Sequence, residues 1–186
     1  MSSSSCRSSL SSAWIDAWIS RVQGSLDVYI SAFESRFGYP PDSNSLEAEE
    51  GFGAAGYDET SAGPGPALPV DLALLHRHVR DVSLPDVGVG LFAHSAQVTV
   101  AGLRGELPTR VVGGGRAPAV DEPVVVFGSD GGGSLFALSR ADGATVYRLP
   151  PGRVERGVYH CAAKPQVLAE NLLGFLTYVE DELRRA

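Results

Sequence analysis

Apolar residues recur every three or four positions near the start of the chain, and this spacing predicts a helix over residues 13–37. Gly38 and the pair Pro40–Pro41 would end it. Gly24 in its middle leaves a kink or two shorter helices as an alternative. We expect the apolar stripe to pack on the rest of the protein, although its tryptophans would also suit an exposed anchor for a partner. The stripe consists of Trp14, Trp18, Val22, Leu26, Ile30, Phe33 and Phe37.

The polar segments around this helix suggest how the chain is organised. Residues 1–12 are rich in serine, and we expect a flexible tail there. Residues 38–67 are rich in glycine, proline and acidic residues, a composition typical of a long loop or linker. Residues 68–186 would then form the main domain.

The pair Leu68–Pro69, followed by Asp71, predicts the start of a second helix, which Pro85 would end. Its apolar face would consist of Leu72, Leu75 and Val79. The next section, residues 87–112, supports two interpretations. Alternating valines favour strands, whereas His94–Leu103 also suits a short helix.

The clearest sheet pattern is the run Pro123–Leu138, in which an acidic, glycine-rich turn separates two apolar stretches. It is followed by Asp142–Gly143, the usual dipeptide of a tight hairpin turn, and then by the apolar stretch Thr145–Leu149. Short strands joined by glycine turns form an antiparallel meander. We therefore predict sheet over residues 123–160.

The last element is predicted to be an amphipathic helix that starts at Pro165 and carries Arg184 and Arg185 at its C-terminal end. Its buried face would consist of Leu168, Leu172, Phe175, Leu176, Val179 and Leu183. The order helix, helix, meander, helix predicts an α+β fold, in which an antiparallel or mixed sheet carries helices on one face. The helix over residues 13–37 would be an N-terminal extension of that domain.

Composition and charge narrow the class of protein. The chain is 44% hydrophobic with a net charge of −7, which disfavours nucleic acid as a partner because phosphates require a basic surface. Cys6 and Cys161 are too few for a disulfide framework, so we expect reduced thiols in a cytoplasmic protein. No segment approaches the ~20 apolar residues of a membrane span, so we expect no membrane association.

The candidate chemical groups do not assemble into a site in the sequence. The segment Ser129–Ser134 lacks the lysine and the following helix of a phosphate-binding loop, so we expect a structural turn, with a binding surface around an exposed Asp130 as the alternative. The pair His76–His78 and the pair His160–Cys161 are poorly spaced to share a metal ion. We therefore predict no catalytic residue, no metal and no cofactor.

Several segments resemble the SUKH superfamily, the Smi/Knr-like domains of bacterial immunity proteins and fungal cell-wall regulators. They are Phe127–Leu138, Val146–Pro150 and Gly157–Tyr159, followed by the helix Ala169–Leu183. The resemblance runs from about Leu68 to Leu183. The chain departs from the family between residues 81 and 112, and in its acidic insertion at residues 38–67.

Bacterial members of that family are typically immunity proteins, which bind a toxin and block its active site. The resemblance therefore implies a non-catalytic, protein-binding domain, and we expect a monomer whose acidic surface attracts a basic toxin domain. The alternatives are an adaptor domain in cell-wall or stress regulation, and an enzyme whose cleft the sequence does not reveal. The candidate partner surface consists of Asp130, Glu47, Glu49, Glu50, Asp58 and Glu59.

Overall fold

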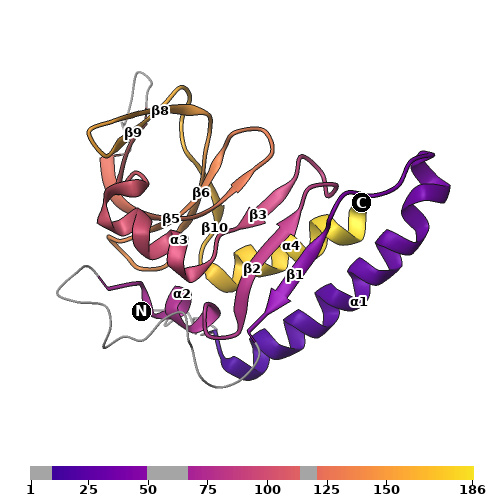
Figure 1. Cartoon of the computed structure of the whole chain (residues 1–186). Helices are drawn as coiled ribbons and strands as arrows, with labels where there is room; N and C mark the ends of the chain where they lie inside the picture. Colours follow the sequence, from indigo (N-terminus) through magenta and orange to yellow (C-terminus); the bar gives the residue numbers. More distant parts are fainter. Residues whose placement is uncertain (1–9, 50–66, 114–120) are drawn as a thin grey trace, which may run out of the picture.

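The computed structural model describes residues 10–49, 67–113 and 121–186, and it shows an α+β fold (Figure 1). A long N-terminal helix, α1 (Ser12–Phe37), lies beside the C-terminal helix, α4 (Leu172–Arg185). The described strands form one large, mostly antiparallel sheet. The α+β class predicted from the sequence is confirmed. No helix in this part of the chain combines the length and the apolarity that crossing a membrane requires.

Ten strands in the described residues make up the sheet. They pair in the order β1-β2-β3-β5-β4-β9-β8, while β6 pairs with β5 and β7, and β10 pairs with β7. Only the β4–β9 pair is parallel among these pairings. The strands are β1 (Ser45–Ala48), β2 (Val79–Leu84), β3 (Leu91–Ala93), β4 (Arg110–Gly113), β5 (Asp121–Asp130), β6 (Leu135–Ser139), β7 (Val146–Leu149), β8 (Gly152–Glu155), β9 (Val158–Cys161) and β10 (Gln166–Ala169).

Strand β5 separates two hydrophobic cores, which explains its continuous apolar run. Val125 and Phe127 face the main core, which the helices cover. Val124 and Val126, on the opposite face, belong to a second core enclosed by β4, β6, β7 and β9. Because successive side chains of a strand point to opposite faces, a strand between two cores has no polar position in this stretch. The predicted meander is confirmed as the neighbours β5, β6 and β7.

Helix α4 packs on the sheet as predicted, but it begins later in the chain. Phe175 lies between Phe127 and Phe136, with ring centroids 5.1 and 5.2 Å apart. The prediction of a start at Pro165 is wrong: Asn171 caps the helix by accepting a hydrogen bond from the Gly174 N–H at 2.8 Å. The residues before it pair with β7 as strand β10, so Leu168 is not on a helix. The remaining members of the predicted face, Leu172, Phe175, Leu176, Val179 and Leu183, are all buried.

Helix α1 is a continuous helix, and its apolar stripe packs on the protein. Ser11 accepts a hydrogen bond from the Trp14 N–H at 3.3 Å, and Gly38 ends the helix with a φ of 80°. Trp18 is fully buried, and its indole N–H donates to the Leu176 carbonyl of α4 at 2.9 Å. Most of the stripe, including both tryptophans, therefore packs in or against the main core, whereas Phe37 at its end is 42% exposed.

The second predicted helix is shorter than its apolar spacing indicated. Helix α2 covers only Val70–Leu75, and Val79–Leu84 is strand β2 instead. Val79 fits the spacing of a helical face, but it also starts an extended segment in which Val82 and Leu84 are buried. Pairing with β1 on one side and β3 on the other fixes that segment as strand. The prediction that a helix continues to Pro85 is therefore wrong.

Two further segments differ from the simplest interpretation of the sequence. The stretch expected to be loop contains strand β1, because Leu46 is buried and its neighbours pair with β2. In the ambiguous middle, the helical interpretation of His94–Leu103 is correct. Helix α3 (Ala96–Ala101) is capped by Ser95 and continues into the wider turn η1 (Gly102–Glu106), so the valines there form no strand.

Candidate functional site

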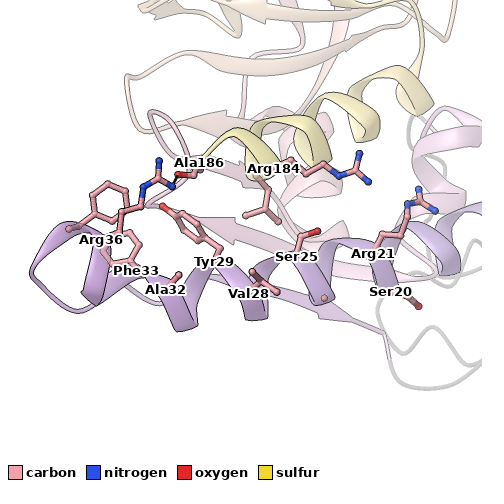
Figure 2. A pocket seen from close by; sticks show the side chains of 13 residues that line it. Ser20, Arg21, Ser25, Val28, Tyr29, Ala32, Phe33, Arg36, Arg184 and Ala186 are labelled. Carbon is pink, nitrogen blue, oxygen red and sulfur yellow. Dashed lines mark hydrogen bonds between the residues drawn. The ribbon is translucent and has the colours of Figure 1, made fainter.

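A groove of about 550 Å³ lies between α1 and the C-terminal end of α4 (Figure 2). On α1 the lining consists of pairs of neighbouring residues. The first pair is Ser20–Arg21, each further pair follows four residues later, and the last pair is Arg36–Phe37. Residues spaced in this way share one face of a helix, so the groove follows α1 for about five turns. The opposite wall is formed by Leu183, Arg184 and Ala186.

The floor of this groove is apolar and well packed. Phe33 is buried and packs edge to face with Tyr29 and at a tilt against Phe37, with ring centroids 5.4 and 4.6 Å away. The Tyr29 hydroxyl donates to the Asp86 carbonyl at 2.8 Å, which fixes the ring. Val28 and Phe37, in contrast, are 69% and 42% exposed. The groove therefore presents exposed apolar side chains on a rigid base.

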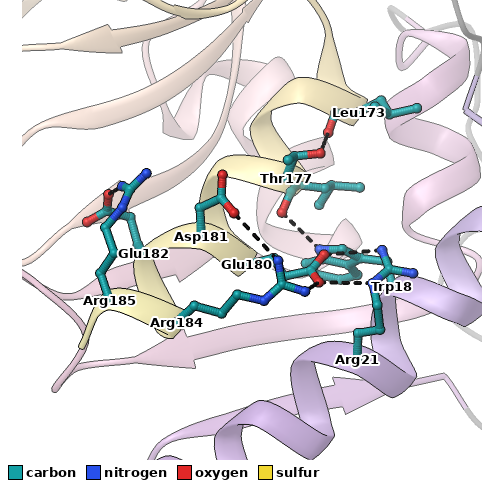
Figure 3. A network of polar contacts seen from close by, with 10 residues as sticks. Trp18, Arg21, Leu173, Thr177, Glu180, Asp181, Glu182, Arg184 and Arg185 are labelled. Carbon is teal, nitrogen blue, oxygen red and sulfur yellow. Dashed lines mark hydrogen bonds and ion pairs between the residues drawn. The ribbon is translucent and has the colours of Figure 1, made fainter.

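A shared carboxylate fixes two arginines at the edge of the groove (Figure 3). Glu180 of α4 is buried and accepts from Arg21 Nε at 2.9 Å, from Arg21 Nη2 at 3.1 Å and from Arg184 Nη2 at 2.5 Å. The hydrogen bond to Glu180 raises the pKa of Arg21 above its ordinary value, so its charge is permanent. The network joins α1 to α4 and orients both guanidinium groups.

A third arginine, Arg36, lies at the far end of the groove. Its guanidinium sits 5.1 Å from the centroid of the Phe37 ring and donates to the Ala186 carbonyl. The described lining thus contains three arginines and no acidic side chain. Glu180 and Asp181 are not part of the lining. Asp181 Oδ1 lies 3.7 Å from Arg184 Nη1. In a chain of net charge −7, the side chains of this lining are basic or uncharged.

Asp130 does not occupy the exposed position that the sequence suggested. Its side chain is buried, accepts from the backbone N–H groups of Gly132 at 3.0 Å and Ser134 at 2.8 Å, and pairs with Arg148 at 2.5 Å. Burial alone would raise its pKa, but these hydrogen bonds and the arginine lower it. Asp130 stabilises the turn between β5 and β6, and the expectation that it is exposed for a partner is wrong.

The other predicted acids divide between described and undescribed residues. Glu47 lies on β1 and pairs with Arg80 Nη2 at 2.6 Å, with both side chains largely exposed. The Glu49 N–H donates to the His78 carbonyl at 2.9 Å, so this residue continues the edge of the sheet. Glu50, Asp58 and Glu59 lie outside the described residues. The structure brings Glu47 and Glu49 together near Arg80 and places Asp130 elsewhere.

The histidines and the described cysteine serve the fold. His76 is 6% exposed, and neither of its ring nitrogens has a hydrogen-bond partner in normal geometry among the described residues. Burial lowers its pKa to about 4. His78 Nδ1 contacts Asp16 Oδ1 at 2.8 Å and ties the turn between α2 and β2 to α1. Burial raises the pKa of Cys161 to about 11. No group of three or more potential metal ligands occurs in the described residues.

The groove was not predicted from the sequence, although one signal for it is present there. Val28 and Arg36 lie beside the apolar stripe of α1 rather than on it, which widens the non-acidic face of the helix. Arg184 had been explained only as a partner of the helix dipole. A groove between two helices far apart in sequence requires their packing, which periodicity does not give.

Comparisons of the chain with models of protein families, with curated proteins and with solved structures found no match.

Proposed function

We propose that this protein is a non-catalytic, protein-binding domain, and that it acts as an immunity protein that neutralises a cognate bacterial toxin. The observation that carries the proposal is the α1/α4 groove, in which Phe37 packs against the buried ring of Phe33 and Val28 is 69% exposed. Fixed apolar side chains beside arginines are typical of protein-binding surfaces, because they bury area without costly ordering on binding.

The state of the reactive groups supports a binding role. A cysteine nucleophile needs an accessible thiolate, whereas Cys161 is buried and its pKa is raised to about 11. A general base needs a pKa near the working pH, whereas burial holds His76 neutral with a pKa of about 4. Asp130 is committed to its turn and to Arg148. Asp130 and Cys161 therefore stabilise the fold, and His76 lines a small, largely enclosed apolar pocket of about 20 Å³.

The more specific part of the proposal, toxin neutralisation, rests on the resemblance of Phe127–Leu138 and the following segments to SUKH immunity proteins. The net charge of −7 favours encounter with a basic toxin domain, because complementary charge raises association rates. Glu47 and Glu49, on the edge of the sheet, remain candidates for contacts with such a partner.

Co-expression tests this function. The protein is produced together with each toxin candidate encoded beside it in its genome, and growth and complex formation are measured. We expect one candidate to arrest growth when produced alone, to be neutralised by this protein and to co-purify with it. If no candidate forms a complex and none is neutralised, the immunity proposal is wrong.

A further inference from the structure

The shape of the α1/α4 groove suits a helical ligand. Its lining on α1 extends from Ser20 to Phe37, which spans about 26 Å at a rise of about 1.5 Å per residue. The groove is straight over this length because one helix forms its whole side (Figure 2). An elongated, apolar groove of this kind accepts an amphipathic helix, which presents anchors at positions i, i+3, i+4 and i+7.

Gly24 lowers the wall of this groove at its centre. A Cβ atom built at Gly24 would meet no atom within 4 Å, so the packing of this chain does not require a glycine there. Glycine is nonetheless among the poorest helix formers. Together with Ser20, Ser25 and Ala32 it leaves a low ridge, and small residues at a contact let two helix axes approach more closely.

Charge identifies the chemistry of the ligand. Arg21 and Arg184 keep 42% and 55% of their side chains exposed despite their contacts with Glu180. The side chains that line the groove include three arginines and no acid, and the two acidic side chains paired with Arg21 and Arg184, Glu180 and Asp181, are not part of the lining. Guanidinium groups with free N–H donors bind carboxylates in a bidentate manner, whereas lysines or arginines on a ligand would be repelled.

We infer that the α1/α4 groove binds an acidic, amphipathic helix of the partner protein. The apolar face of that helix covers Val28 and Phe37, and its glutamates or aspartates reach Arg21, Arg36 and Arg184. This inference rests on the proposed protein-binding function and names the segment of the partner that is recognised. The partner as a whole can still be basic, because long-range attraction depends on net charge and docking depends on local contacts.

Matched peptides test the inference on the full-length protein. Three stapled helical peptides of about 18 residues share one leucine and alanine face, and their edge positions are all glutamate, all glutamine or all lysine. Binding is measured by NMR titration, which locates the contact on the chain. We expect the glutamate peptide to bind about tenfold more tightly than the glutamine peptide, and the lysine peptide not to bind. Shifts should concentrate on the groove residues, and added salt should weaken binding.

Two substitutions separate the groove from the rest of α1. Ser25→Trp fills the groove, whereas Ser31→Trp places the same side chain on an exposed position of α1 outside the lining. We expect the glutamate peptide to lose binding to the first variant by about tenfold or more and to bind the second normally. Arg36→Gln, which leaves the groove open, should weaken the glutamate peptide by about threefold and the glutamine peptide not at all. Thermal unfolding confirms that each variant is folded.

The possible outcomes distinguish this inference from the proposed function. Equal binding of the three peptides, or unchanged binding to Ser25→Trp, overturns the acidic-helix inference. A concentration-dependent dimer that Ser25→Trp abolishes also overturns it, because a second copy of the chain then occupies the groove. If Ser25→Trp still neutralises the toxin, the inference fails while the immunity function stands. If the glutamate peptide binds in the groove but no toxin is neutralised, only the immunity function fails.

Discussion

Position 24 is a glycine, although the fold alone would favour a residue with a side chain there. It lies inside α1, and a methyl group at this position would meet nothing within 4 Å. Gly24→Ala should therefore raise the free energy of unfolding by about 0.5–1 kcal/mol, because alanine loses less backbone entropy in a helix. Urea denaturation of the two proteins measures this difference.

The same substitution should reduce affinity for an acidic helix, since its methyl group raises the low ridge of the groove. Greater stability together with weaker binding would indicate that the glycine is kept for binding. A loss of stability in Gly24→Ala would instead show that the space beside Gly24 is filled in solution, and it would contradict the open groove.

His76 should make the stability of the protein sensitive to mild acid. Its folded pKa of about 4 lies below the unfolded value near 6.5, so the unfolded chain binds the proton more readily between these pH values. Stability is full above about pH 6.5 and falls as the pH decreases, by a total of about 3 kcal/mol near pH 4. In His76→Leu we expect this loss to be largely absent in urea unfolding measured at pH 7, 6 and 5.

His94 and Asp81 line the same small pocket as His76, so their protonation also affects how stability changes with pH. Burial lowers the pKa of His94, so His94→Leu should remove a further part of the acid sensitivity. Burial raises the pKa of Asp81, whose protonation favours the folded state at low pH and opposes the loss. An unchanged pH dependence in His76→Leu would show that the ring is accessible to water.

Asp130 illustrates what sequence can and cannot predict about a single residue. The glycine turn around it was predicted, because such turns depend on neighbours in the chain. Its burial was not, because that depends on Arg148, eighteen residues away and brought close only when β6 and β7 pair. The arginines of the groove were not predicted for the same reason. Arg21 and Arg184 are far apart in the sequence and come together only because both bind Glu180.

At the scale of elements, Phe175 is the main contact between α4 and the sheet. It is 2% exposed and packs edge to face with Phe127 at 5.1 Å. We predict that Phe175→Ala lowers the free energy of unfolding by about 3–5 kcal/mol, because the surrounding core cannot collapse fully into the cavity. Thr177→Ala, on an exposed position of the same helix, is the matched control and should change stability by less than about 0.5 kcal/mol. A loss below about 1 kcal/mol in Phe175→Ala would show that this face is not core.

Elements with a strong local signal were predictable from the sequence, and elements without one were not. The repeat in α1 continues for seven turns, and glycine turns mark the ends of the apolar stretches that form β5, β6 and β7. Strands β2 and β10 have only a few residues each, and their apolar positions also fit the ends of neighbouring helices. Hydrogen bonds to distant strands decide these cases, and local spacing carries no information about them.

For the molecule as a whole, α1 and the sheet share one core. The buried side chains of α1 contact the same cluster as Phe175 and Phe127, and that cluster runs without interruption into α4 and β2. Trp18 donates to the Leu176 carbonyl, and Arg21 satisfies the buried Glu180. The helix expected to be an extension therefore completes the hydrophobic core and covers polar groups on α4.

A fragment that lacks residues 1–37 should consequently fail to fold cooperatively. Removing α1 exposes the apolar faces of α4 and β1 to water, and it removes the hydrogen bonds that Trp18 and Arg21 make to α4. We expect the fragment 38–186 to aggregate or to give a broad thermal transition, and a synthetic peptide of residues 10–37 to restore a sharp one when it is added. Full-length protein provides the reference transition, and sedimentation at several concentrations checks the predicted monomer. A fragment that unfolds sharply without the peptide would show that residues 38–186 form an independent domain.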